Sequence, residues 1–415
     1  MPLPIKPLPI IERWDCHQCG ACCRGSLVPL SAEELSRIRS QKWDERPEFQ
    51  GRDVVVPDGW LSSTYRLAHR EDGSCVFLLP DGACRLHKEL GFEAKPLVCR
   101  MFPLQIVPRD NSALVTVRRA CPSAAADKGR PLNEHLGIAR QIAREGKLAD
   151  GTVEPPPIKP GEPRSWRVAR RLLETFQRLL TDERYPPVRR LVHAATLAGL
   201  LMQAKTRSLS DQRLVELFDL LETHVAEEAA GLFADRPPPS ASAGVLFRQS
   251  VADTVRLLPG YVARPNWHER WRLMGAAWKF IRGSGQVPKL HPAFPETTFE
   301  QLEQPLGRLD PAIYQPLTRM IETTAVSWCY ALMNRRGWSI VESVWMLSLT
   351  YPIGLWLVRW RSAGGGPRPE YMSDIIAALD RTQGYAPLAR GNQRRRLRVL
   401  SRMHELERLI IWYAQ

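Results

Sequence analysis

A cluster of cysteines near the N-terminus carries the clearest chemistry in this sequence. Eight of the nine cysteines lie within residues 16–121, and the ninth is Cys329. Spacers of two residues let successive thiolates converge on one small metal centre, and C-x2-C-x2-C is a ligand spacing of bacterial ferredoxins. The densest part of the cluster has this spacing and reads Cys16-His-Gln-Cys19-Gly-Ala-Cys22-Cys23. The sequence therefore predicts a metal site in this part of the chain.

The candidate metal ligands are the eight thiolates of this region. Besides the four in the opening motif, they are Cys75, Cys84, Cys99 and Cys121. Cys121 precedes Pro122, as in the distant Cys-Pro pair of ferredoxins. Cys22 and Cys23 are not expected to share a metal atom, because adjacent side chains point in different directions along an extended chain. Either one binds while the other packs, or each faces a different centre.

Residues around the cysteines suit an iron–sulfur cluster. Gly20 and Gly25 allow the tight turns and the close backbone approach that a bulky cluster requires. Arginines could offset the negative charge of a thiolate-ligated cluster. Four of them lie near cysteines in the sequence: Arg24, Arg100, Arg118 and Arg119. We therefore expect an iron–sulfur cluster ahead of zinc.

Zinc is the principal alternative, since it also takes four thiolates, or thiolates together with histidine. His17, His69 and His87 lie near the cysteines, but none is assigned as a ligand. A disulfide framework is a second alternative. The first residues, 1–6, lack the basic and apolar segments of a signal peptide. This favours a reducing compartment, the cytoplasm, where clustered cysteines bind metals more often than they form disulfides.

The composition is that of a globular protein, with 44% hydrophobic and 25% charged residues. The net charge of +14 is compatible with an acidic partner, such as nucleic acid, an anionic membrane surface or an anionic cofactor, and equally with a soluble protein rich in arginine. Six arginines form a basic run within 390–402. A solvated helix face is the preferred interpretation of this run, and a contact with nucleic acid or an acidic partner comes second.

The pattern along the chain predicts a mainly α protein with two domains. Residues 1–150 form a small, loop-rich metal domain, and residues 164–415 form an all-helical domain. Residues 151–163 connect them as a Pro-rich linker. Its core, Pro155-Pro-Pro-Ile-Lys-Pro160, favours polyproline II and resists packing.

Hydrophobic periodicity and capping signals place the elements. A helix starts at Ser31 with Glu34 as its capping-box partner, and a second covers 133–147. Strands are expected at 54–56 and 113–117. The helical domain is predicted to hold helices over 168–180, 187–206, 211–232, 243–258, 267–283, 311–334, 339–360, 370–380 and 392–413.

Two apolar segments allow a functional as well as a packing interpretation. The stretch 340–356 contains a single charge, Glu342, and approaches the length of a membrane span, but we expect a buried core helix. Trp267, Trp271 and Trp278 share one helical face. Core packing is the preferred interpretation, and a stacking surface for adenine or a peptide is the alternative.

The cysteine pattern resembles that of the YkgJ-type cysteine-cluster proteins, a family of zinc- or iron-chelating domains. After the opening motif, three further elements match the family in order, and the resemblance covers about residues 14–124. These elements are Cys75-Val-Phe-Leu, Cys84-Arg-Leu-His and Pro96-Leu-Val-Cys99-Arg100-Met-Phe-Pro103.

Within that superfamily, the architecture is similar to that of the flagellin lysine N-methylases. Residues 84–91 resemble their version of this segment, and 324–388 are loosely similar. The resemblance implies a [4Fe-4S] cluster, S-adenosylmethionine as methyl donor and a protein partner that presents a lysine. Tyr314, Tyr330 and Glu322 are candidates for handling the lysine amine. No G-x-G-x-x-G, P-loop or nucleophile-elbow motif is present.

Two other functions stay open beside an iron–sulfur methylase. One is a non-catalytic, zinc-stabilised module whose helices bind a partner protein. The other is metal chelation or storage. Cys329 lies on a predicted apolar helix and is expected to be a buried thiol without a metal.

Overall fold

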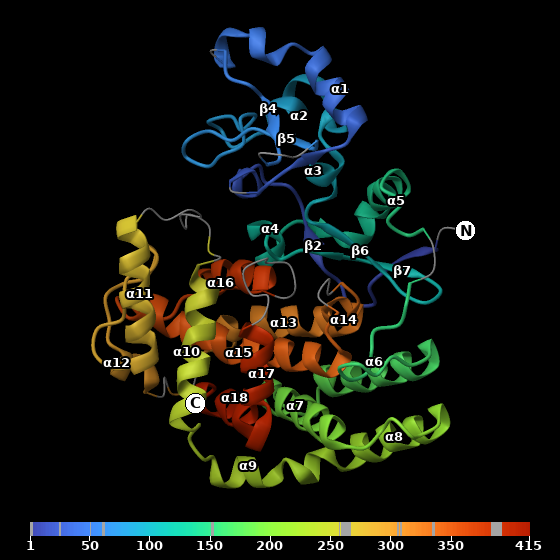
Figure 1. The fold of residues 1–415 in the computed structure, drawn as a ribbon, viewed down its shortest axis with the longest axis vertical. Helices are drawn as coiled ribbons and strands as arrows, with labels where there is room; N and C mark the ends of the chain where they lie inside the picture. Colours follow the sequence, from blue (N-terminus) through green and yellow to red (C-terminus); the bar gives the residue numbers. More distant parts are fainter. Residues whose placement is uncertain are drawn as a thin grey trace.

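The computed structural model describes residues 3–24, 26–49, 51–59, 63–150, 153–256, 258, 267–304, 307, 309–333, 337–382 and 392–415. A small N-terminal part that contains all the strands of these residues is followed by a large helical part (Figure 1). The expectation of a mainly α protein with a small, loop-rich first part is therefore confirmed.

The first 101 residues contain a lobe built around a short antiparallel sheet, which we call the cysteine lobe (residues 16–101). Its three strands are in the order β3-β5-β4, and three short helices surround them (Figure 1). The elements are β3 (Pro29–Leu30), α1 (Ala32–Ser40), β4 (Val55–Pro57), β5 (Tyr65–Leu67), α2 (Arg85–Leu90) and α3 (Leu97–Met101). Ser31 caps α1, and the capping box with Glu34 is formed as predicted.

The lobe has a core of its own, separate from the cores of the rest of the molecule. Trp43, Phe49 and Phe77 pack edge to face, with ring centroids 5.2–5.7 Å apart. This geometry is the favourable one for aromatic rings because it brings a positive ring edge to a negative ring face.

A second sheet joins the lobe to the helices. Its order is β1-β7-β6, in which β1 runs parallel and β6 antiparallel to β7. The predicted strands at 54–56 and 113–117 both exist, but they belong to different sheets. The elements of this part are β1 (Ile5–Pro7), β2 (Arg13–Trp14), β6 (Leu104–Pro108), β7 (Ala113–Val117), α4 (Pro122–Ala125), β8 (Arg130–Pro131) and α5 (Leu136–Glu145).

The helical region follows the predicted order of helices. Its members are α6 (Trp166–Thr181), α7 (Pro187–Gln203), α8 (Asp211–Glu228), α9 (Ala230–Asp235), α10 (Ala241–Val255), α11 (Trp267–Arg282), α12 (Phe299–Glu303), α13 (Pro311–Ser327), α14 (Cys329–Leu332), α15 (Ile340–Ser362), α16 (Pro369–Thr382), α17 (Asn392–Leu400) and α18 (Glu405–Tyr413).

Three helices that the sequence predicts as continuous are interrupted. The segment 211–232 divides at Ala229 into α8 and α9. The segment 311–334 breaks at Trp328, whose φ of 58° is left-handed and separates α13 from α14. The segment 392–413 breaks at Met403 and His404, with φ of 54° and 60°. Hydrophobic periodicity does not detect such breaks, because the apolar residues on both sides still face the same core.

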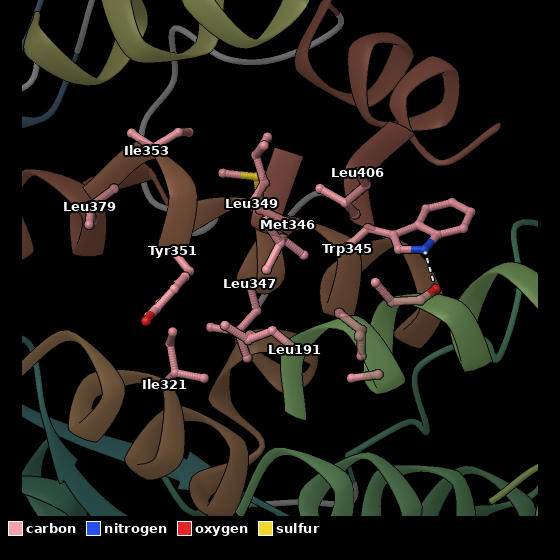
Figure 2. Close-up of a cluster of buried hydrophobic side chains, with 14 of the residues drawn as sticks. Leu191, Ile321, Trp345, Met346, Leu347, Leu349, Tyr351, Ile353, Leu379 and Leu406 are labelled. Atoms are coloured by element: carbon pink, nitrogen blue, oxygen red, sulfur yellow. Dashed lines mark hydrogen bonds between the residues drawn. The ribbon is translucent and has the colours of Figure 1, made fainter. Parts of the chain in front are cut away.

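The centre of the helical region is α15, of which nearly every residue is buried. Leu347, Leu349 and Tyr351 of this helix point into the cluster drawn in Figure 2. Trp345 packs there as well, and its indole N–H donates to the carbonyl of Ala195 on α7 at 3.3 Å. Length and composition alone would allow α15 to span a membrane, but its apolar stretch is entirely enclosed by protein, as expected for a core helix.

The Pro-rich segment is packed, contrary to the expectation that it resists packing. Pro156 and Ile158 are buried. The carbonyls of Pro157 and Ile158 accept hydrogen bonds from the N–H groups of Ile340 and Val341 at 2.9 and 3.4 Å. These carbonyls therefore satisfy two of the free N–H groups at the start of α15.

Three tryptophans of α11 correct another expectation. Trp267, Trp271 and Trp278 do share one helical face, but they are 67%, 57% and 67% exposed. The opposite face of the helix is the buried one, through Ala276 and Phe280. The aromatic pattern was correctly assigned to one face, whereas the choice of that face as the core face is wrong.

The sheet and the helices are joined by arginines that follow β7. Arg118 binds Asp380 of α16 at 2.8 Å. Arg119 binds the buried Glu12 at 2.9 Å and donates to the hydroxyl of Thr323 on α13 at 3.0 Å. Both guanidinium groups are largely buried, which makes these polar contacts costly to break.

Candidate metal centre

The opening cysteine motif forms a tight loop that ends in a short 3-10 helix, Ala21–Cys23. Gly20 enters this turn with a φ of 68°, the left-handed conformation that the sequence predicts for it. Gly25 lies outside the described residues. Because the backbone is helical here and not extended, Cys22 and Cys23 do not diverge, and their Sγ atoms lie 3.9 Å apart. The expectation that their side chains point in different directions is therefore wrong, whereas the assignment of each thiol to a metal stays a prediction.

A second cysteine loop packs directly against the first. The N–H of Cys75 donates to the carbonyl of Cys23 at 2.7 Å. Gly82 closes the contact from the other side, since a Cβ at this position would lie 2.1 Å from the carbonyl oxygen of Gln18. Only glycine fits such an approach of two backbones. The sequence 75–84 is therefore shaped to hold the loop that carries Cys22 and Cys23.

Two more thiols reach the same core from helices. Cys84 is the residue before α2, and Cys99 lies within α3. Together with Cys23 and Cys75 they contact the hydrophobic cluster of the cysteine lobe. The structure thus brings together five of the eight predicted ligands, all within the lobe: Cys22, Cys23, Cys75, Cys84 and Cys99.

Three of these thiols, those of Cys22, Cys75 and Cys99, have raised pKa values, which favours their protonated form. The hydrogen-bonded thiol of Cys23 raises the pKa of Cys22, although Cys22 is an exposed residue. Burial, and to a lesser degree the neighbouring Cys84, raises the pKa of Cys75 to about 11. Burial and the thiols of Cys75, Cys84 and Cys22 raise the pKa of Cys99. A bound cation would favour the thiolates and release their protons.

The other three predicted ligands are Cys16, Cys19 and Cys121. Cys121 precedes α4, and Pro122 occupies the first position of that helix. Its thiol belongs to the hydrophobic cluster of the second sheet. Burial raises the pKa of Cys121, and the neighbouring Cys19 adds to this. Cys16 and Cys19 are exposed. The eight thiols therefore do not surround one point, and the role of each as a ligand stays a prediction.

The four arginines expected to balance a cluster are engaged with carboxylates. Arg24 is exposed beside Asp72, and Arg100 is buried between Glu93 and Glu145. Arg118 and Arg119 hold the junction with the helices, as described above. These contacts are with carboxylates, and the expectation that the four arginines balance the charge of a cluster stays a prediction.

Two cations near the thiols, Lys95 and Arg70, were missed by sequence reasoning. Lys95 acts on two of the thiols. Its charge acts to lower the pKa of both Cys22 and Cys99. Lys95 directly precedes the Pro96-Leu-Val-Cys99 element, and this position within a matched element is the signal that could have identified it.

The histidines make other contacts. His17 bonds to the Ser123 hydroxyl at 2.8 Å, and His69 to the carbonyl of Ser26 at 3.0 Å. The ring of His87 packs against that of Phe92. The expectation that the metal ligands are thiolates and not these histidines stays a prediction.

The geometry suits a metal in part. Two zinc–sulfur bonds of about 2.3 Å at a tetrahedral angle place their sulfurs about 3.8 Å apart, close to the 3.9 Å between Cys22 and Cys23. Among the described residues, however, no three Cys, His, Asp or Glu side chains already surround a single point. Further ligands would have to rotate inward from the neighbouring positions on binding.

Comparison with known proteins agrees with this geometry. Residues 15–122 match the family model described as "Putative zinc- or iron-chelating domain", named for its CxxCxxCC motif. The cysteine-rich segment is therefore similar to this family of zinc- or iron-chelating domains. The match includes all eight predicted ligands and stops before the helical region. The similarity to flagellin lysine N-methylases is not part of this finding and stays a prediction.

An uncharacterized protein of Methanocaldococcus jannaschii is similar to a limited part of the chain. The two sequences are 26% identical over 137 residues, which cover 31% of this chain and 44% of the relative. The chain thus spans less than half the length of this relative. No solved structure matches.

Three arginines of the C-terminal basic run form ion pairs with carboxylates of the helical region. Arg394 and Arg398 bind the buried Glu342 of α15 at 2.7 and 2.8 Å, and Arg396 binds Asp253 at 2.6 Å. Although burial acts against it, hydrogen bonds from Arg394 and Ser339 lower the pKa of Glu342. Arg394 and Arg398 thus stabilise α15. Arg395, Arg398 and Arg402 are nevertheless exposed, as the preferred interpretation of a solvated face predicts, and Arg390 lies outside the described residues.

Proposed function

We propose that the cysteine lobe binds zinc or iron through thiolates of the group formed by Cys22, Cys23, Cys75, Cys84 and Cys99. The observation that carries this proposal is the 3.9 Å separation of the Cys22 and Cys23 sulfurs, which matches two ligands on one tetrahedral ion. The match of residues 15–122 to a zinc- or iron-chelating domain supports it independently.

The bound metal would act first as a cross-link. Cys22 and Cys23, Cys75 and Cys84, and Cys99 belong to three stretches of chain that are distant in sequence. A metal held by thiolates contributes its binding free energy to folding. The residues of this chain supply the rest, since the backbone bond from Cys75 to Cys23 fixes the two loops and Lys95 favours the thiolate form.

A single metal ion and a four-iron cluster require different distances between their ligand sulfurs, so the distance between Cys22 and Cys23 bears on which of the two is bound. Ligands of a four-iron cluster bind different irons and lie farther apart than two ligands of one ion. The pair at Cys22 and Cys23 therefore favours a single zinc or iron ion. A [4Fe-4S] cluster is the second form, supported by the ferredoxin-like spacing of Cys16, Cys19 and Cys22.

Methyl transfer from S-adenosylmethionine to a protein lysine is the enzymatic function that the sequence resemblance suggests. A cleft of about 770 Å³ between Lys159, Lys205 and Arg402 is large enough for a donor of this size. The candidate residues give less support. Glu322 is paired with Arg190 at 2.6 Å, and Tyr330 lines a cavity of about 10 Å³ that has room for one water.

The decisive experiment is anaerobic purification of the full chain followed by zinc, iron and sulfide analysis. About one zinc or iron ion per chain without sulfide would support the single-ion site. About four irons with sulfide would establish the cluster. Folded protein without stoichiometric metal would overturn the proposal.

Serine variants assign the site. Cys22→Ser and Cys99→Ser are expected to lower the metal content, whereas Cys329→Ser, which removes a thiol from α14, should not. Circular dichroism shows whether each variant is folded.

Transfer of a labelled methyl group from S-adenosylmethionine to a cellular protein tests the enzymatic function. A metal-loaded chain that neither binds the donor nor labels any protein would exclude this function.

A further inference from the structure

Helix α11 has two apolar faces, and only one of them is covered. Ala276 and Phe280 are buried against the rest of the helical region. The other face carries large apolar side chains that are 37–67% exposed. We call this face the α11 stripe, and it consists of Trp267, Trp271, Met274, Trp278 and Ile281. Figure 1 shows α11 at the outer edge of the molecule, beside α10.

The α11 stripe is a continuous feature. Its members are separated by four, three, four and three residues, so they stand above one another on one side of the helix. Isolated exposed apolar residues need no explanation, but a contiguous apolar patch marks an interaction site. Three of the five are tryptophans, which combine a large apolar body with an N–H group that prefers a polar partner.

Cationic side chains line the α11 stripe. The sequence of the helix contains four arginines and lysines, one histidine and a single acidic residue, Glu269. The basic residues that are exposed are His268, Arg270, Arg272, Lys279 and Arg282. An apolar face rich in tryptophan between cationic flanks is the pattern of a helix that lies in the interface of a membrane.

We propose that α11 binds the surface of an anionic lipid bilayer, with the α11 stripe inserted among the headgroups and acyl chains. Tryptophan side chains prefer this depth, with the ring in the apolar layer and the N–H near the headgroups. The flanking arginines and lysines would meet lipid phosphates, and the net charge of +14 attracts the whole chain to such a surface.

The helix lies in the membrane plane and does not cross it. Its 16 residues extend over about 24 Å, less than the apolar core of a bilayer. One of its faces is already occupied by Phe280 and the rest of the protein. Among the described residues of α11, the large apolar side chains that are exposed and can meet lipid are those of the α11 stripe.

Charge also decides between a membrane and a second copy of this chain. In a symmetric pair of α11 helices, the cationic flanks of one copy would face those of the other and repel them. An anionic surface instead attracts both flanks. An acidic protein groove would share this advantage, so it is an outcome of the test and not part of the proposal.

The test is flotation of the full-length, metal-replete protein with vesicles of phosphatidylcholine alone or mixed with phosphatidylglycerol. We expect binding to the anionic vesicles and its weakening at high salt. The combined variant Trp267→Gln, Trp271→Gln, Trp278→Gln should lose at least about tenfold in affinity. A matched variant, Leu220→Gln with Val399→Gln, removes apolar side chains that are similarly exposed on α8 and α17 and should bind normally.

Each result decides the proposal. Failure of the wild-type protein to bind phosphatidylglycerol vesicles overturns it, as does unchanged binding of the tryptophan variant. A dimer in light scattering that this variant abolishes, without vesicle binding, would assign the stripe to a second copy instead. Circular dichroism and metal content show that the variants fold. A second variant, Arg270→Gln with Arg272→Gln, should weaken binding to anionic vesicles while leaving the apolar stripe intact.

Discussion

The cysteine lobe and the helical region achieve order in different ways. The lobe encloses a small core of three aromatic rings and a few aliphatic residues, bordered by thiols. The helical region encloses one continuous core around α15 (Figure 2). Small cores rarely stabilise a fold alone and usually need a disulfide or a metal, whereas large ones do not. The comparison teaches that the thiols are placed where apolar burial is insufficient.

Removal of the metal should have the largest effect on stability, and this effect should differ between the two regions. A strong chelator is expected to unfold the lobe while the helical region keeps its structure, because structural metal contributes on the order of 10 kcal/mol to the folding of small domains. Calorimetry with and without chelator measures this. A single transition that the chelator does not change would show that the lobe is stable through its apolar core alone.

The junction between the regions gives the next largest effect. Glu12 is 1% exposed and accepts hydrogen bonds from Arg119 and Thr116 at 2.9 and 2.8 Å. Glu12→Ala leaves the buried Arg119 without its carboxylate and should cost about 3–5 kcal/mol in denaturant unfolding. Glu12→Gln keeps an acceptor oxygen and should cost less. Equal losses for both variants would show that the charge of Glu12 is unimportant.

Overpacking tests how tightly the core of the helical region is filled. A Cβ on Gly354 of α15 would lie 2.7 Å from Leu317 and 3.3 Å from Leu379. Gly354→Ala should therefore cost about 1–3 kcal/mol despite the better helix propensity of alanine. Gly199→Ala on α7, which meets no atom within 4 Å, is the control and should be neutral or stabilising. A Gly354→Ala protein as stable as the wild type would mean that the core around α15 is packed less tightly than these contacts indicate.

A pH effect confined to the helical region should be the smallest. The hydrogen bond and charge of Glu407, 3.4 Å away, raise the pKa of His404. The resulting stabilisation is fully present below the unfolded pKa of about 6.5 and is lost as pH rises through the folded value. His404 is partly exposed, so at most about 0.5 kcal/mol is expected. His404→Asn, which tolerates the left-handed backbone, should remove this pH dependence of thermal unfolding.

The sequence was sufficient for features that are encoded locally. The capping box at Ser31, the order of helices from 166 onward and the buried nature of 340–356 all follow from spacing and composition. The cysteines were identified for the same reason, because their spacing is itself the signal. Local patterns also showed that the three tryptophans of α11 share one face, but the expectation that this face packs in the core was wrong, because periodicity does not state what covers a face.

What the sequence could not supply depends on contacts between distant residues. The approach of Cys23 to Cys75, the use of Arg100 to bind Glu93 and Glu145, and the effect of Lys95 on the thiols all need the tertiary fold. The left-handed breaks at Trp328 and Met403 fall on residues whose types give no warning, because neither is a glycine or an asparagine.

The Pro-rich segment also determines how the molecule would respond to force. The chain that follows the sheet runs past Pro155 and contacts the first turn of α15. There the carbonyls of Pro157 and Ile158 accept hydrogen bonds from N–H groups of that helix. A pull on the cysteine lobe would therefore be transmitted to the most buried helix, and the two hydrogen bonds and the buried Ile158 side chain would bear the load. In a single-molecule stretching experiment, this anchor is where mechanical resistance should begin.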